Sequence, residues 1–172
     1  MSSYIKYIGW FALAVISQVL LFNNISLLNY IVPFGFLWFI IILPIKVNHT
    51  LLVLISFLLG YLVDMFSGGV IGLHAAAATM AGFIRPYVLK KYHTAEFEYD
   101  SKALPNIKNL GVSNFVIYSL IIIYTHHLLY YLLEAFSTKD FLLTMFRALL
   151  NSVFTLLFIL FFQYIQIRTK DK

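Results

Sequence analysis

The chain of 172 residues contains no cysteine and little charge, and both shortages restrict what the protein can be. Without cysteine it has no disulfide, no thiolate metal ligand and no cysteine nucleophile. Only 11% of the residues are charged whereas 62% are hydrophobic, and the mean hydropathy is +0.89. These values lie far from those of ordinary globular proteins, so the composition predicts an integral membrane protein with a single domain.

Long stretches without charge indicate the topology. No charged residue occurs in 7–45, 47–63, 65–84, 109–133 or 148–167. A helix needs about 20 apolar residues to cross a bilayer, and the first stretch is long enough for two helices joined at the polar turn 23–26. The sequence therefore predicts an all-α, compact bundle of six transmembrane helices, over 4–22, 27–43, 50–66, 70–89, 112–136 and 139–166, with a cytoplasmic loop over 90–111. A soluble bundle would need a polar outer face on each helix, and these faces are missing.

Lysine and arginine indicate the orientation of the bundle. With a cytoplasmic N-terminus, the inside segments hold all of the 12 basic residues except Lys139 and Arg147. We therefore expect both termini in the cytoplasm. The first helix lacks a small-residue cleavage site and is expected to remain as an anchor. The isoelectric point of about 9.4 reflects this bias, and no basic patch on a soluble module predicts a nucleic-acid partner.

Ionisable side chains within the expected helices are candidates for function, because charge is costly in lipid and usually faces the bundle interior or a cavity. In the predicted topology, the outer half of the bilayer holds Asp64, His74, His127, Glu134 and Arg147. Spacings of three and four residues align four side chains on one face of the fifth helix: Tyr124, His127, Tyr131 and Glu134. Arg147 can extend toward Glu134 or Asp64, so we expect a carboxylate–arginine pair.

A glycine-rich turn joins the third and fourth expected helices, in the stretch from Asp64 to His74. Gly68, Gly72 and Ala76 recur at every fourth residue, and Ala78 and Gly82 continue small residues at that spacing further along the helix. This spacing of small residues lets helix backbones pack closely in lipid. We therefore expect the fourth helix to be buried by internal packing. The turn follows no strand, so its likeness to a nucleotide-binding loop is accidental.

No pattern predicts a catalytic residue, a cofactor or a bound metal. His126 and His127 are adjacent and point about 100° apart on a helix, which excludes joint metal binding. The sequence also contains neither His-Glu-x-x-His nor Gly-x-Ser-x-Gly. The favoured interpretation is that the polar residues fix the pairing of helices, and a proton or solute pathway through Asp64, Glu134 and the histidines stays open as an alternative.

Several short motifs occur in a fixed order along the chain. Gln18-Val-Leu-Leu-Phe-Asn-Asn ends the first expected helix, Pro33-Phe begins the second and Leu43-Pro44 ends it. The glycine turn contains Gly60-x-x-x-Asp64-x-Phe-Ser-Gly68 and Gly72-Leu-His74-Ala75. This ordered set resembles the rod shape-determining protein MreD family over most of the chain. The later motifs, Phe83-Ile-Arg85-Pro86-Tyr87 and the stretch from His126-His127 to Glu134, are similar to its Bacteroidetes-type branch.

The resemblance implies a non-enzymatic component of the bacterial inner membrane that helps to maintain rod shape during cell elongation. The implied partners are MreC, the actin-like MreB filament, the polymerase RodA and a class B penicillin-binding protein, together with membrane lipid. Lys46, the lysines of 90–108 and the tail 168–172 are expected to meet MreB or anionic lipid. The residues expected to have structural or partner-contact roles are Gln18, Asp64, Gly68, Gly72, His74, Arg85, His127, Glu134 and Arg147.

The resemblance also implies a fold similar to the substrate-binding subunits of energy-coupling factor vitamin transporters. Such a subunit is the alternative function, because a polar, aromatic-lined outer cavity around Tyr124, His127, Tyr131 and Glu134 would suit a small ligand. Those subunits are similar to one another in an Ala-x-x-x-Ala motif on the surface of the first helix, which docks the transmembrane coupling protein. Here Ala12 and Ala14 are two residues apart, so that signature is missing.

Overall fold

The computed structural model describes residues 2–25, 31–92, 103–136 and 141–170, and the regular elements within these ranges are helices. The longer ones are α1 (Ser2–Leu20), α3 (His49–Ser67), α4 (Leu73–Leu89), α7 (Val112–Ala135) and α8 (Phe141–Lys170). The shorter ones are η1 (Phe22–Asn24), α2 (Leu37–Ile42), η2 (Lys90–Tyr92) and α6 (Ile107–Leu110). The predicted all-α class is therefore confirmed. The parts of the expected elements that fall on 26–30, 93–102 and 137–140 lie outside the described residues.

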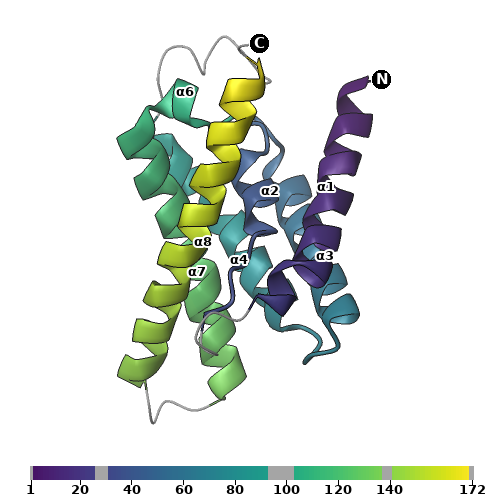
Figure 1. Cartoon of the computed structure of the whole chain (residues 1–172), viewed down its shortest axis with the longest axis vertical. Coiled ribbons are helices and arrows are strands. Elements are labelled where there is room, and N and C mark those ends of the chain that lie inside the picture. The colour runs from purple at the N-terminus through teal and green to yellow at the C-terminus, as the bar shows by residue number, and fades with distance from the viewer. Residues whose placement is uncertain (1, 26–30, 93–102, 137–140, 171–172) are drawn as a thin grey trace.

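The long helices run up and down along one common axis (Figure 1). α1 begins and α8 ends at the same end of the molecule, which we call the terminal end (Figure 1). The turn between α3 and α4 lies at the opposite end, which we call the distal end (Figure 1). α4 packs against both α3 and α7, and α8 packs against α7, so α4 forms the centre of the bundle.

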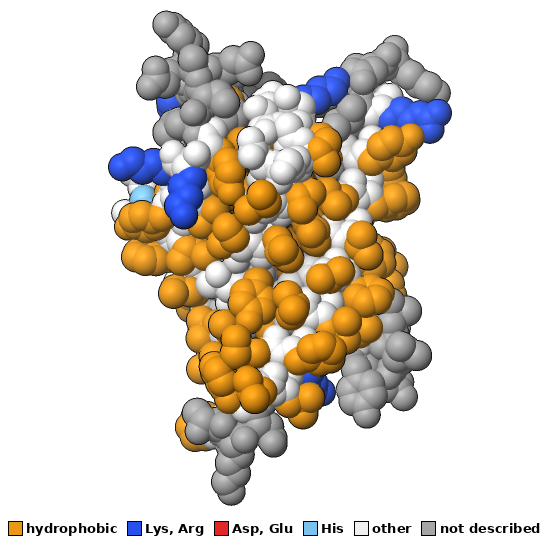
Figure 2. Space-filling model, turned by 90° about the vertical axis from the view of Figure 1, so that its left-hand side faces the viewer, with side chains coloured by type: hydrophobic (Ala, Val, Ile, Leu, Met, Phe, Trp, Pro, Cys, Tyr) orange, Lys and Arg blue, Asp and Glu red, His pale blue; other side chains and the backbone are white. Residues whose placement is uncertain are grey.

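In the part of the chain that the structure describes, four helices are long and apolar enough to cross a membrane, judged by length and composition: Ile5–Asn24, His49–Ser67, Val112–Ala135 and Phe141–Gln166. Large apolar side chains lie on their outer surfaces, and Leu13, Leu54 and Leu157 are each more than half exposed. Figure 2 shows hydrophobic side chains across the middle of one face and most of its visible Lys and Arg near the terminal end. A soluble protein rarely exposes so continuous an apolar surface, so these helices are consistent with a membrane protein.

The helix expected over 27–43 is not continuous. Only α2 is helical, and residues 31–36, which we call the broken segment, are irregular. Pro33 has no amide hydrogen and disfavours a helical conformation in the residue before it. Side chains of α1 and α8 bond the buried amides instead: Val32 N donates to Asn151 Oδ1 (2.8 Å), Phe34 N to Thr155 Oγ1 (3.1 Å) and Phe36 N to Gln18 Oε1 (3.3 Å). Tertiary hydrogen bonds thus replace those that a helix would make.

Gln18, a predicted structural residue, is fully buried and fixes the broken segment to α1. Its Oε1 accepts from the Phe36 amide, and its Nε2 donates to the Pro33 carbonyl (3.3 Å) and to Asn23 Oδ1 (2.8 Å). Asn23 in turn donates from Nδ2 to Ser67 Oγ at the end of α3 (2.6 Å). One glutamine therefore connects α1 to the broken segment and, through Asn23, to α3.

The orientation prediction counted Arg85 as an inside surface charge, but its side chain is only 1% exposed. The guanidinium donates to the carbonyls of Ile41 (3.4 Å), Leu43 and Pro44 (3.5 Å). Its Nε donates to Tyr118 Oη (3.0 Å), and that hydroxyl donates to the Ile41 carbonyl (2.8 Å). A cation at the C-terminal end of a helix stabilises unpaired carbonyls and the negative end of the helix dipole. Arg85 therefore fixes the end of α2 to α4 and α7.

α4 is buried as predicted, and part of the predicted small-residue pattern makes its close contacts. Ala78 and Gly82 are buried, and a Cβ added to Gly82 would lie 2.8 Å from Ser56 Cβ of α3. The other predicted positions do not pack in this way. Ala76 is exposed, and a Cβ added to Gly68 or Gly72 would meet nothing within 4 Å. Gly60 of α3 also lies against the α4 backbone, because a Cβ there would come within 2.6 Å of the His74 carbonyl carbon. Gly68 and Gly72 have φ angles of 69° and 108°, which glycine adopts readily, so they serve the turn.

Part of the expected cytoplasmic loop 90–111 packs on the bundle. Ala103 and Leu110 are buried, and Ile45 N donates to the Ala103 carbonyl (3.0 Å). Asn106 caps α6, because its Oδ1 accepts from the Asn109 amide (2.8 Å). Residues 103–111 are thus a structural part of the bundle rather than a solvated connector.

Candidate functional site

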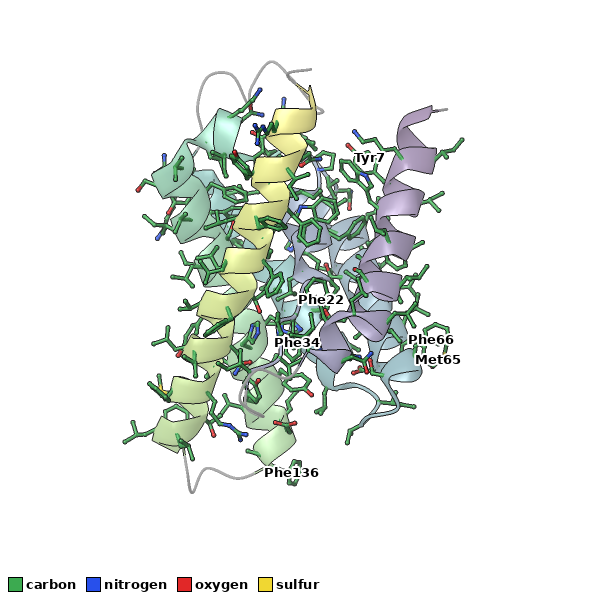
Figure 3. The ribbon with its side chains drawn as sticks, in the orientation of Figure 1. Tyr7, Phe22, Phe34, Met65, Phe66 and Phe136 are labelled. Carbon is green, nitrogen blue, oxygen red and sulfur yellow. The ribbon has the colours of Figure 1, made fainter. Side chains whose placement is uncertain are left out.

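A cavity of about 340 Å³ lies at the distal end of the bundle, and we call it the polar cavity. Its lining comes from η1, the broken segment and the distal parts of α3, α4, α7 and α8. The polar lining residues are Asn23, Asp64, Ser67, His74, Glu134 and Arg147, and the aromatic ones are Phe34, Tyr130 and Tyr131. Figure 3 shows Phe34 in the interior of the bundle, whereas Met65 and Phe66 of α3 point away from it. A second cavity of about 360 Å³ shares Tyr131, Glu134 and Arg147 with the first.

Asp64 lines the polar cavity and caps α4, and it is only 3% exposed. Its Oδ2 accepts from the amides of Gly72 (2.9 Å) and Ala75 (3.0 Å), and its Oδ1 accepts from the amide of His74 (3.0 Å). These amides lie at the start of α4, where they have no partner within the helix. The carboxylate also faces the positive end of the helix dipole. Asp64, which the sequence offered as an acid of open role, is therefore engaged as the cap of α4.

Three histidines and two aromatic residues pack together at the cavity: Phe34, His74 and Tyr130 line it, and His126 and His127 lie behind them. The ring of His126 lies 5.7 Å from that of His74 and 5.6 Å from that of His127, measured between centroids. Phe34 contacts all three imidazoles at centroid distances of 4.6, 5.4 and 4.7 Å for His74, His126 and His127. The Tyr130 ring lies 4.4 Å from that of His74. The broken segment thus holds Phe34 at the centre of an aromatic cluster.

The three histidines differ in how many of their ring nitrogens have hydrogen-bond partners. His127 Nδ1 donates to the Ile123 carbonyl (2.9 Å), and its Nε2 lies 3.3 Å from Thr155 Oγ1. Within the described part of the chain, neither ring nitrogen of His126 has a hydrogen-bond partner, nor does Nδ1 of His74. An unpaired buried polar atom costs about 1–3 kcal/mol. His126 and His74 are therefore the least satisfied groups beside the cavity.

The predicted carboxylate–arginine pair does not form among the described residues. Glu134 and Arg147 both line the polar cavity and are exposed, yet no ion pair joins them. Asp64 is engaged by the amides of α4 instead. The guanidinium carbon of Arg147 lies 5.9 Å from the centre of the Tyr131 ring. Since an exposed ion pair contributes only about 0–1 kcal/mol, a cation–π contact of about 0.5–1 kcal/mol competes with it.

The structure gathers most of the predicted site residues at the distal end. Asp64, His74, Glu134 and Arg147 line the polar cavity, and His127 lies behind it in contact with Phe34. The predicted face of the fifth helix is only partly correct, since Tyr131 and Glu134 line the cavity whereas Tyr124 and His127 do not. The predicted residues in supporting places are Gln18 at the broken segment, Gly68 and Gly72 in the α3–α4 turn, and Arg85 at the end of α2.

Sequence reasoning missed the neutral residues that shape the cavity. Phe34 and Tyr130 are aromatic residues in an aromatic-rich chain, so nothing in the pattern distinguished them. Asn151 and Thr155 gave a usable signal, because two polar residues four positions apart on an apolar helix share one face. His126 was set aside with its neighbour as a metal ligand, but it is fully buried in the aromatic cluster.

The polar cavity offers a guanidinium, a carboxylate, an amide, a hydroxyl and several aromatic faces, a set that suits binding of a small polar molecule. Among the residues that the structure describes, no group of three His, Cys, Asp or Glu side chains is placed to hold a metal ion. Comparisons with models of known protein families, with curated proteins and with solved structures find no match to this chain.

Proposed function

We propose that this protein is a non-enzymatic scaffold of the cell-elongation machinery in the bacterial inner membrane, and a member of the MreD family. In this proposal six segments cross the membrane: α1, the broken segment with α2, α3, α4, α7 and α8. Both termini and the 90–111 loop face the cytoplasm, in line with the lysine and arginine distribution. The scaffold links MreC and MreB to RodA and a class B penicillin-binding protein.

The observation that carries this proposal is that the motif residues hold the bundle together. Gln18 fixes the broken segment, Asp64 caps α4 and Arg85 fixes the end of α2. Their polar atoms bond to backbone groups, which need internal partners wherever water is absent. Motifs used in this way support a protein whose task is to keep a fixed shape inside the membrane, as a scaffold must.

The outer faces of α1 and α8 supply a surface for a partner helix. Their exposed apolar side chains include Ile5, Ile8, Leu13 and Ile16 on α1 and Phe146, Val153, Leu157 and Phe161 on α8. Helices associate in lipid by van der Waals packing of such faces. At the terminal end, Lys90 and Lys91 are exposed and suit contact with MreB or anionic lipid.

A crosslinking pull-down of the tagged protein from native membranes tests this function. The purified material is analysed by proteomics for partner proteins and by mass spectrometry for small molecules. The scaffold proposal expects MreC, RodA or a class B penicillin-binding protein. Recovery of an energy-coupling module in place of these partners overturns it.

A substrate-binding subunit of an energy-coupling factor vitamin transporter is the second candidate, and the polar cavity favours it. The cavity volume of about 340 Å³ lies at the lower end of the range for small-molecule sites. A vitamin released by denaturing the purified protein, together with a co-purifying coupling module, establishes this candidate. Absence of both from a preparation that contains MreC rejects it.

A further inference from the structure

The polar cavity contains several polar groups that have no partner among the residues that the structure describes. Glu134 and Arg147 line it without forming an ion pair with a described residue. His74 also lines it, is only 6% exposed, and has no hydrogen-bond partner for Nδ1. Ionisable groups near the hydrocarbon region are costly when unpaired. The hydrogen bonds that hold the bundle together do not explain why these three side chains line the same cavity.

The backbone beside the cavity is irregular, and this is a second and independent observation. Val32 and Phe34 of the broken segment both line the polar cavity. Irregular backbone at membrane depth is tolerated where it is buried in protein or lines a cavity, and broken helices often form binding sites. Here Asn151 and Thr155 of α8 bond the amides of Val32 and Phe34, so the segment has a defined position. The cavity wall is therefore built and not a gap left by poor packing.

The side chains on the cavity indicate the chemistry of a ligand. The guanidinium of Arg147 can donate two parallel hydrogen bonds to a carboxylate. The Glu134 carboxylate can accept from an ammonium group. Asp64 is already bonded to three amides, so it is the less available acid. The aromatic faces of Phe34 and Tyr130 suit an apolar or cationic part of the ligand.

We propose that the polar cavity binds a small zwitterion of amino-acid size. Its carboxylate bonds to Arg147, its ammonium bonds to Glu134, and its remaining part lies against Phe34 and Tyr130. A zwitterion satisfies both unpaired charges at once, whereas an anion or a cation alone leaves one of them unpaired. The cavity volume of about 340 Å³ is at the small end for ligand sites. This binding site goes beyond the scaffold function and does not depend on it.

Binding is tested on the purified full chain in detergent. The probes are the twenty proteinogenic L-amino acids, measured by thermal shift and then by calorimetric titration for those that raise the melting temperature. For the tightest probe, the amine that lacks its carboxylate and the acid that lacks its amine are titrated in parallel. We expect each analogue to bind at least about tenfold more weakly, since each loses one charge-assisted contact.

Three variants place the site. Arg147→Gln and Glu134→Gln each remove one charge from an exposed cavity position, and each is expected to weaken binding of the probe by about tenfold or more. Arg168→Gln is the matched control, because Arg168 is an exposed arginine at the other end of α8. It is expected to leave binding unchanged. The ligand-free melting temperatures of all three variants should stay close to that of the unmodified protein.

Three results overturn the proposal. No amino acid binds at millimolar concentration, or binding survives in both cavity variants, or one of the single-charge analogues binds as tightly as its parent amino acid. The last result would identify an anion or cation site in place of a zwitterion site. None of them bears on the scaffold function, which rests on recovery of its protein partners.

Discussion

Removing the Asp64 cap is expected to destabilise the whole distal half of the bundle. In Asp64→Ala the amides of Gly72, His74 and Ala75 lose their acceptor. Gly72 is half-buried and can be solvated, whereas His74 and Ala75 are buried. Two buried amides left unpaired, at about 1–3 kcal/mol each, give an expected loss of about 4 kcal/mol in the free energy of unfolding.

Asp64→Asn is expected to have an intermediate effect. The asparagine oxygen can still accept from the amides of Gly72 and Ala75, but its NH₂ group then faces the His74 amide, which is also a donor. One hydrogen bond and the favourable charge at the start of α4 are lost, for an expected loss of about 2 kcal/mol. The order of stability should be the unmodified protein, then Asp64→Asn, then Asp64→Ala.

The assay is unfolding by sodium dodecyl sulfate in mixed micelles, combined with amide hydrogen exchange. Exchange should rise first at residues 72–75, because their amides lose protection locally. Glu134→Gln is the control: this carboxyl lines the same cavity but is exposed, so its loss should change stability by about 0.5 kcal/mol or less. Equal stability of Asp64→Ala and the control would refute the capping role.

Three further predictions use the same unfolding assay. Gln18→Leu should lower the free energy of unfolding by about 1–3 kcal/mol, because the Phe36 amide stays buried without a partner. The control Ser17→Ala removes a hydroxyl that is bonded within its own helix and should change stability little. Equal losses in the two variants would contradict the role of Gln18. Arg85→Gln should lower the free energy of unfolding by about 3 kcal/mol, because the carbonyls at the end of α2 lose a charged donor. An unchanged stability would show that these carbonyls find other partners. Gly60→Ala should lower the free energy of unfolding by about 1–3 kcal/mol, because the new Cβ overpacks against α4. The control Gly9→Ala has nothing within 4 Å of its new Cβ and should raise that free energy by about 0.5–1 kcal/mol through helix propensity. Effects of the same sign would contradict the close approach of α3 to α4 at Gly60.

The length of the apolar stretches was enough to predict two of the long helices. The expected spans over 50–66 and 112–136 lie close to α3 (His49–Ser67) and α7 (Val112–Ala135). The ends of α3 are marked locally, by Asn48, which caps the helix by accepting from the Leu51 amide, and by Gly68 in the left-handed conformation after it. Such signals lie within a few residues of the helix end, so a sequence pattern contains them.

The broken segment could not be predicted in this way. Hydropathy measures apolar length, and residues 31–43 are as apolar as a helix requires. What breaks the helix is the supply of partners from far along the chain, since Asn151 bonds to Val32 across 119 positions. Pro33 is the local hint in the sequence, but it identifies no partner. The same holds for Arg85, whose carbonyl acceptors lie more than 40 positions away.

The cavity was predicted by its charged residues and missed in its neutral ones. Asp64, His74 and Glu134 were evident because charge and imidazole are rare in apolar stretches. The absence of an Arg147–Glu134 ion pair was not evident from the sequence. Both residues are exposed, so only a small free-energy difference decides whether the Arg147 side chain is solvated, pairs with Glu134 or contacts the Tyr131 ring. Burial in three dimensions, rather than residue type, separates these outcomes.

The proposed scaffold function is tested most directly by photo-crosslinking in the cells that naturally produce the protein. A photoreactive amino acid is placed singly at exposed apolar positions on different helices, Leu13 on α1, Leu54 on α3 and Leu157 on α8. The scaffold proposal predicts protein crosslinks to MreC, RodA or a class B penicillin-binding protein from at least one of these positions, with the other positions crosslinking to lipid. Crosslinks to lipid alone from all three positions, or to an energy-coupling module, would contradict it.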